Sequence, residues 1–133
     1  GRKRISGEQA RNLRIELKDQ WNFHSNFWDP LTPASPREVV FLNGMDEEKK
    51  QAVADLLEKN VTLPFYLLDC EEGLFEIGRE QIFSGAHEGM VFDDSLSWVI
   101  YFSHHYTLTF GGEWLVKAVK ELYSGEEEKL NSW

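Results

Sequence analysis

Three stretches of the chain repeat apolar residues at the three- and four-residue spacing of an amphipathic helix. The first follows Ser6 and the second follows Asp46, both residue types that cap helix N-termini. The third follows Gly111-Gly112 and stops at Ser124-Gly125. The repeated positions are Ala10, Leu13, Leu17 and Trp21, then Ala52, Val53, Leu56 and Leu57, then Trp114, Leu115, Ala118, Val119 and Leu122. The pattern predicts helices near the start, in the middle and near the end of the chain.

Short apolar runs between these stretches predict strands. They are residues 38–42, 64–68, 73–78 and 90–92, and two strands on either side of His104-His105. The runs 38–42 and 64–68 are apolar without alternation, which is typical of strands buried on both faces. With the helices placed before, between and after them, these strands predict an α+β fold. We expect two layers, a mainly antiparallel sheet with helices on one face.

The two strands around His104-His105 predict their own register. Trp98, Ile100 and Phe102 share one face of the first strand, and Leu108 and Phe110 share one face of the second. A loop of three or five residues pairs Phe102 with Leu108, whereas a two-residue loop would pair apolar with polar positions. We therefore expect an odd-numbered loop with both histidines at the hairpin tip.

An irregular, proline-containing segment runs from Trp21 to Glu38 and carries the aromatic residues Trp21, Phe23, Phe27 and Trp28. We expect these rings to pack onto the core, the alternative being an exposed recognition patch. No repeat or second domain is evident, so residues 1–133 are predicted to form one domain with frayed ends at 1–5 and 126–133.

The charge of the chain is uneven. The net charge is −9. Residues 1–19 hold six basic and three acidic side chains, or +3, so the rest carries −12. An acidic body repels phosphate and attracts basic partners, which argues against nucleic acid. Apolar runs are too short to span a membrane. The single cysteine, Cys70, suggests a reducing compartment, and we predict a cytoplasmic protein.

Acidic residues are the main candidate binding groups. We expect Glu71, Glu72, Asp93 and Asp94, together with Trp28, to contact a basic protein partner. No cofactor and no metal are expected. The sequence leaves the oligomeric state open, and self-association through the aromatics of residues 21–28 is a further alternative.

An enzyme is the alternative reading. His87, His104 and His105 lie in loops, and with nearby carboxylates they would serve a hydrolase or a metal-dependent enzyme. Their spacing matches no metal-ligand motif, and one cysteine is too few for a typical structural zinc site. Ser103 next to His104 is a poor nucleophile–base pair, since neighbours on a strand point apart. The site prediction is therefore no catalytic residue.

The block "WVIYFSHHYTLTFGGEWL" at residues 98–115 resembles a pattern in small stand-alone bacterial proteins of unknown role. A strand ending in Ser-His, a Thr-rich strand, Gly-Gly and a helix opening with Trp-Leu carry the resemblance. Some such small acidic domains resemble immunity proteins of bacterial toxin systems. The resemblance implies a non-enzymatic protein-binding domain, an immunity protein that neutralises a basic toxin, and it defines no active site.

Overall fold

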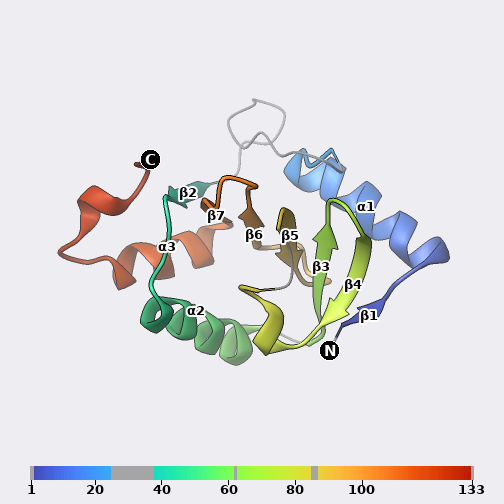
Figure 1. Cartoon of the computed structure of the whole chain (residues 1–133), viewed down its shortest axis with the longest axis horizontal. Coiled ribbons are helices and arrows are strands. Elements are labelled where there is room, and N and C mark those ends of the chain that lie inside the picture. The colour runs from blue at the N-terminus through green and yellow to red at the C-terminus, as the bar shows by residue number, and fades with distance from the viewer. Residues whose placement is uncertain (1, 25–37, 62, 85–86, 133) are drawn as a thin grey trace.

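The computed structural model describes residues 2–24, 38–61, 63–84 and 87–132. Within them, seven strands form one antiparallel sheet in the order β1-β4-β3-β5-β6-β7-β2 (Figure 1). The strands are β1 (Lys3–Arg4), β2 (Val39–Leu42), β3 (Phe65–Asp69), β4 (Gly73–Ile77), β5 (Gly89–Phe92), β6 (Val99–Phe102) and β7 (Leu108–Gly111). The helices are α1 (Gly7–Trp21), α2 (Glu47–Asn60) and α3 (Glu113–Leu122), with 3₁₀ turns at Arg79–Gln81 and Glu127–Lys129. The α+β class and the antiparallel sheet are confirmed.

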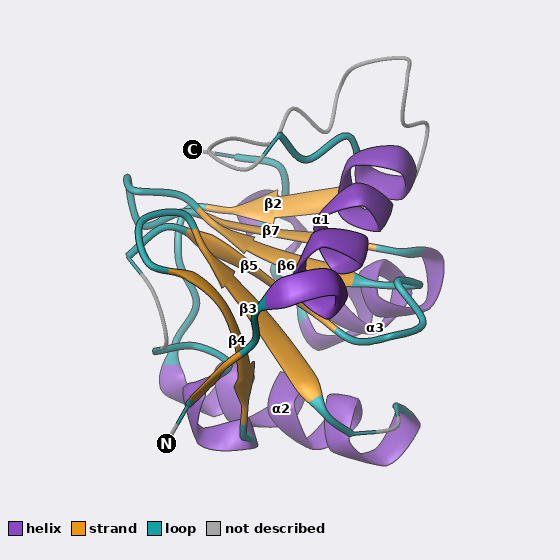
Figure 2. Cartoon of the chain, turned by 90° about the vertical axis from the view of Figure 1, so that its right-hand side faces the viewer, coloured by secondary structure: helices purple, strands orange, loops and turns teal. Residues whose placement is uncertain are grey.

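The helices cover both faces of the sheet, which differs from the single helical layer that we expected (Figure 2). Helix α1 packs on one face, where Leu17 and Trp21 belong to the same hydrophobic core as Leu68 of β3. Helices α2 and α3 pack on the other, where Leu57 and Val119 belong to the second core. The physical reason is the unbroken apolar run of β3, whose residues are all buried. Alternate side chains of that strand point to opposite faces, so both faces need a cover.

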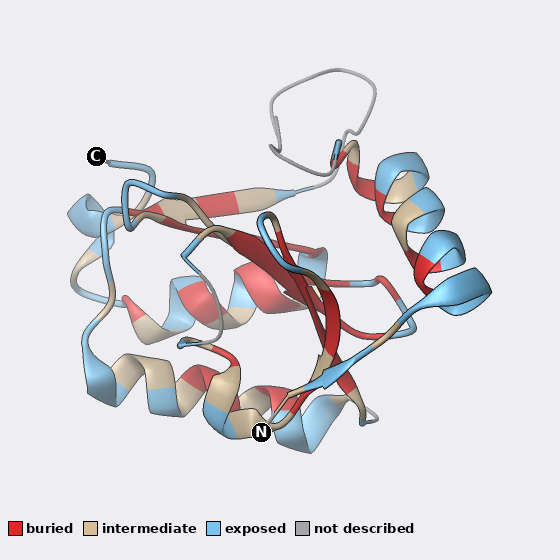
Figure 3. Cartoon of the chain, turned by 45° about the vertical axis from the view of Figure 1, so that its right-hand side comes forward, coloured by how far each residue is buried: buried red, intermediate tan, exposed pale blue. Residues whose placement is uncertain are grey.

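Burial matches the predicted stripe fully in α1 and only in part in α2 and α3, where Ala54 and Val116 are buried outside the predicted positions (Figure 3). In α1 the repeated positions from Ala10 to Trp21 are the buried ones. The indole Nε1 of Trp21 donates to the carbonyl oxygen of Leu96 at 2.8 Å, which ties α1 to the loop before β6. Asp46 caps α2 as predicted, accepting from the amide of Lys49 at 2.8 Å. Ser6 occupies the N-cap position of α1 without a side-chain capping bond.

The hairpin of β6 and β7 has the predicted register. Phe102 pairs with Leu108 and Ile100 with Phe110, leaving a five-residue loop at 103–107 with the histidines at its tip. The opposite face of this hairpin is not solvated, because Thr109 is 6% exposed on the side that α1 covers.

Both terminal segments that we expected to be frayed contain ordered contacts. Lys3 and Arg4 pair with Glu76 and Phe75 of β4. Near the other end, Asn131 exchanges hydrogen bonds with the backbone of Phe41, its amide donating at 2.8 Å and its side-chain oxygen accepting at 3.1 Å.

The aromatic segment is described only in part. Trp21 and Phe23 are 0% and 2% exposed, so both pack onto the core as expected. Phe27 and Trp28 lie outside the described residues, and the role predicted for Trp28 stays a prediction.

Candidate functional site

The turn between β3 and β4 contains two of the predicted acidic residues, Glu71 and Glu72, whose backbone amides bind the buried carboxylate of Asp69. Asp69 ends β3 and is 8% exposed. Its Oδ1 accepts hydrogen bonds from the backbone amides of Glu71 at 2.9 Å and Glu72 at 3.1 Å. A short acidic side chain that bonds the backbone two residues ahead is a standard turn former. Asp69 therefore fixes the direction in which Glu71 and Glu72 leave the sheet.

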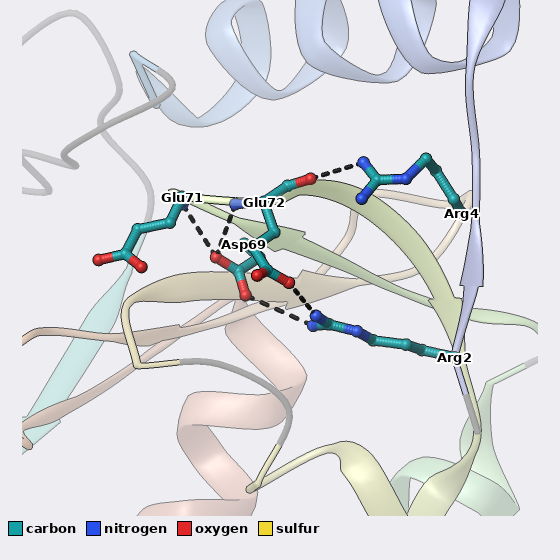
Figure 4. A network of polar contacts seen from close by, with 5 residues as sticks. All are labelled: Arg2, Arg4, Asp69, Glu71 and Glu72. Atoms are coloured by element: carbon teal, nitrogen blue, oxygen red, sulfur yellow. Dashed lines mark hydrogen bonds and ion pairs between the residues drawn. The ribbon is translucent and has the colours of Figure 1, made fainter.

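Two arginines from the N-terminal strand lie against this turn (Figure 4). Arg2 forms ion pairs with Glu72 and with Oδ2 of Asp69, the latter at 3.4 Å. Arg4 donates from Nη1 to the carbonyl oxygen of Glu72 at 2.6 Å. Both guanidinium groups also lie over the ring of Phe75, with Cζ at 4.0 Å from the ring centroid for Arg2 and 4.7 Å for Arg4. Guanidinium over an aromatic face is a favourable cation–π arrangement.

Glu71 and Glu72 differ in their surroundings. The carboxylate of Glu71 points away from both arginines into solvent, whereas that of Glu72 faces Arg2 (Figure 4). The side chain of Glu72 is still 56% exposed. Both predicted acidic residues are therefore accessible, and one of them is already engaged by the chain's own N-terminal strand.

Asp93 and Asp94 lie at the opposite end of β3 and β5 from this turn. Asp69 pairs with Gly89, whereas Tyr66 pairs with Phe92, the residue before Asp93. Asp93 is 4% exposed, and its Oδ1 accepts from the amide of Ser95 at 3.0 Å. Asp94 is exposed. The four predicted carboxylates therefore do not share one surface, and Asp93 has a structural role in a turn.

Tyr66 links Asp94 to the core. Burial, together with the hydrogen bond and charge of Asp94, raises the pKa of Tyr66 to about 12.

The histidines of the hairpin tip lie close to Glu88. Nδ1 of His104 is 2.8 Å from Oε1 of Glu88. The hydroxyl of Tyr101 donates to the other oxygen, Oε2, at 2.7 Å. The ring of His105 lies 4.0 Å from that of His104. Glu88 thus positions His104 from one side while Tyr101 fixes Glu88 from β6.

Tyr106 is the most exposed large apolar side chain described, at 74%. Its backbone has φ 64°, and its ring meets the edge of His87 at a centroid distance of 5.5 Å. Ser103 fixes the loop around it, because its Oγ accepts from the amides of His105 and Thr107 at 3.2 Å each. The tip is thus an ordered loop that presents a tyrosine to solvent.

Three features of the described residues concern the enzymatic alternative. No group of three or more His, Cys, Asp and Glu side chains there could hold a metal ion. The Ser103 hydroxyl lies 2.5 Å from that of Thr107. Burial and the charges of Glu88, Asp69 and Glu71 raise the pKa of the Cys70 thiol to about 12, which opposes thiolate formation.

Sequence reasoning did not assign a role in these sites to Arg2, Arg4, Phe75 or Tyr106. The basic start of the chain and the acidic run at residues 69–72 were both visible, but no sequence pattern joins residues about 70 positions apart.

Comparison with known proteins gives no family assignment. The chain matches no protein-family model, and neither curated proteins nor solved structures gave a significant match. Among the described helices, none combines the length and the apolar character that crossing a membrane requires.

Proposed function

We propose that this protein is a non-enzymatic binding domain that engages a basic protein through one end of its sheet. The sheet-end surface consists of Glu71, Glu72, His87, His104, His105 and Tyr106. Its segments are neighbours because Asp69 pairs with Gly89 and Gly89 with Phe102. The 70–72 turn follows β3, residues 87–88 precede β5 and the 103–107 loop follows β6, so all three lie at the same end of adjacent strands.

The observation that carries this proposal is Tyr106. A non-glycine residue at positive φ is strained, and such strain concentrates at functional sites. Tyrosine supplies a large, amphipathic contact at low entropic cost and is enriched at interfaces. A 74% exposed tyrosine on an ordered tip therefore supports a role in binding.

The charge of the chain supports a basic partner. Residues 20–133 carry −12, and the sheet-end surface contributes the exposed carboxylates of Glu71 and Glu72. Complementary charge accelerates association and excludes acidic competitors. Neutralisation of a basic toxin in the cytoplasm is the specific form of the proposal, as the immunity-protein resemblance implied.

The test is affinity capture from a lysate of the source organism, followed by titration of the purified partner at several salt concentrations. Tyr106→Ser and Glu71→Lys should each weaken retention of a basic protein. Glu121→Lys on α3 is the matched control, since it makes the same charge change at an exposed site away from the sheet end. Equal retention by all three variants would reject the sheet-end surface.

A further inference from the structure

The outer edge of β4 pairs with β1, a strand of two residues. β4 pairs with β3 over all five of its residues, from Gly73 to Ile77. On its other side β1 supplies two paired residues, Lys3 and Arg4, and both are exposed. β1 is therefore held on β4 by few backbone contacts, and a longer extended segment could pair with more of β4.

The side-chain contacts that β1 makes at this edge favour arginine at two alternate positions, 2 and 4. Arg2 and Arg4 both stack over Phe75, and they bind the turn through the Glu72 and Asp69 carboxylates and through the Glu72 carbonyl. Arginine suits both roles, because its planar fork pairs with carboxylates and stacks on rings, which lysine does less well. The intervening Lys3 lies opposite Glu76, so its side chain is on the other face.

From this geometry we infer that the β4 edge is a recognition site for an extended segment with an Arg-X-Arg pattern, and that residues 2–4 occupy it in cis. A basic partner binds by adding a strand to β4 in place of β1, a mode in which backbone pairing gives affinity and side-chain contacts give specificity. The inference rests on the proposed function, for which it names the kind of segment recognised.

The N-terminal strand then acts as an internal competitor. A tethered segment competes at a high effective concentration, so it weakens binding of the same segment offered in trans. Replacing both arginines in the full chain should release the edge without removing any residue of the receptor surface.

The probe is a synthetic peptide of residues 1–6, Gly-Arg-Lys-Arg-Ile-Ser, labelled at its C-terminal end and followed by fluorescence anisotropy. Arg2→Ser/Arg4→Ser protein should bind it at least about tenfold more tightly than the unaltered protein, because the internal competitor is lost. A peptide with lysine at both arginine positions has the same charge and should bind the same variant at least about tenfold more weakly than the arginine peptide. Circular dichroism checks that each variant is folded.

Glu72 and Glu121 provide a matched pair of charge-removing changes in the Arg2→Ser/Arg4→Ser protein. Glu72→Gln should reduce peptide binding at least about fivefold, because it removes a charged partner of arginine. Glu121→Gln should change it less than about twofold, because Glu121 is exposed on α3, which packs beside β7 and β2, so only diffuse charge is lost.

Three results would each overturn the inference. The unaltered and Arg2→Ser/Arg4→Ser proteins could bind the peptide equally, the two glutamine variants could have equal effects, or the lysine peptide could bind as tightly as the arginine peptide. If the peptide does not bind while Tyr106→Ser still weakens capture of a basic protein, the proposed function stands and the β4 edge is not its site. If both fail, the proposed function falls as well.

Discussion

Alanine at Gly112 is expected to destabilise the protein severely. Gly112 joins β7 to α3 at φ 108°. A Cβ there would lie 2.3 Å from the carbonyl oxygen of Ser97 and 3.0 Å from Cα of Trp98. Both are backbone atoms, so no side-chain rotation relieves the overlap. The unfavourable backbone conformation costs about 1–3 kcal/mol and the displacement of packed backbone a similar amount, which gives about 2–6 kcal/mol together. That is a large part of a typical folding free energy.

Two other glycines separate these contributions. Gly125 has φ 86° and nothing within 4 Å of an added Cβ, so Gly125→Ala measures the backbone cost alone, about 1–2 kcal/mol. Gly44 has open space and no positive φ, so Gly44→Ala should be neutral or stabilise by up to about 1 kcal/mol. Urea unfolding followed by circular dichroism at 222 nm gives each free energy. Equal losses for Gly112→Ala and Gly125→Ala would refute the argument from the Ser97 contact.

Two further predictions concern the α1 face of the sheet. Trp21→Phe removes the indole hydrogen bond to Leu96 and should lower the free energy of unfolding by about 1–2 kcal/mol in urea titration; unchanged stability would contradict the role given to that bond. Burial raises the pKa of Cys70 from 9.0 and of Tyr66 from 10.0, each to about 12. The folded state therefore keeps protons that the unfolded chain releases, and the stability present below pH 9 should fall between pH 9 and 12. Melting temperatures across that range test this, with Cys70→Ser expected to reduce the decline, and a constant melting temperature would be the contrary result.

Local pattern was sufficient for most of the secondary structure. The apolar stripe of α1, the Asp46 cap of α2 and the register of the β6–β7 hairpin all depend on residues close in sequence, where the periodicity of side chains constrains the answer. Strand β1 escaped prediction because two exposed basic residues carry no strand pattern. β1 forms because the edge of β4 can pair with it and because Phe75 and Glu72 bind its arginine side chains.

The sequence of β3 already contained the information that helices cover both faces of the sheet. An antiparallel sheet with one solvated face would alternate apolar and polar residues, whereas β3 does not alternate. The apolar run was therefore itself evidence for helices on both faces. The candidate site could not be anticipated in the same way, since Arg2 and Glu72 meet through a sheet edge.

A count of acidic residues in the sequence overestimates the number of carboxylates that are available to bind a partner. The carboxylates of Asp69 and Asp93 are buried and bond the backbone of their own turns. Glu72 faces Arg2, so the acidic turn already has a basic occupant from the same chain. Among the predicted acidic residues, Glu71 is exposed beside the hairpin tip and Asp94 is exposed at the far end of the sheet. A partner that requires Glu71 but not Asp94 must therefore use the sheet end, and one that competes with Arg2 must also use the edge of β4.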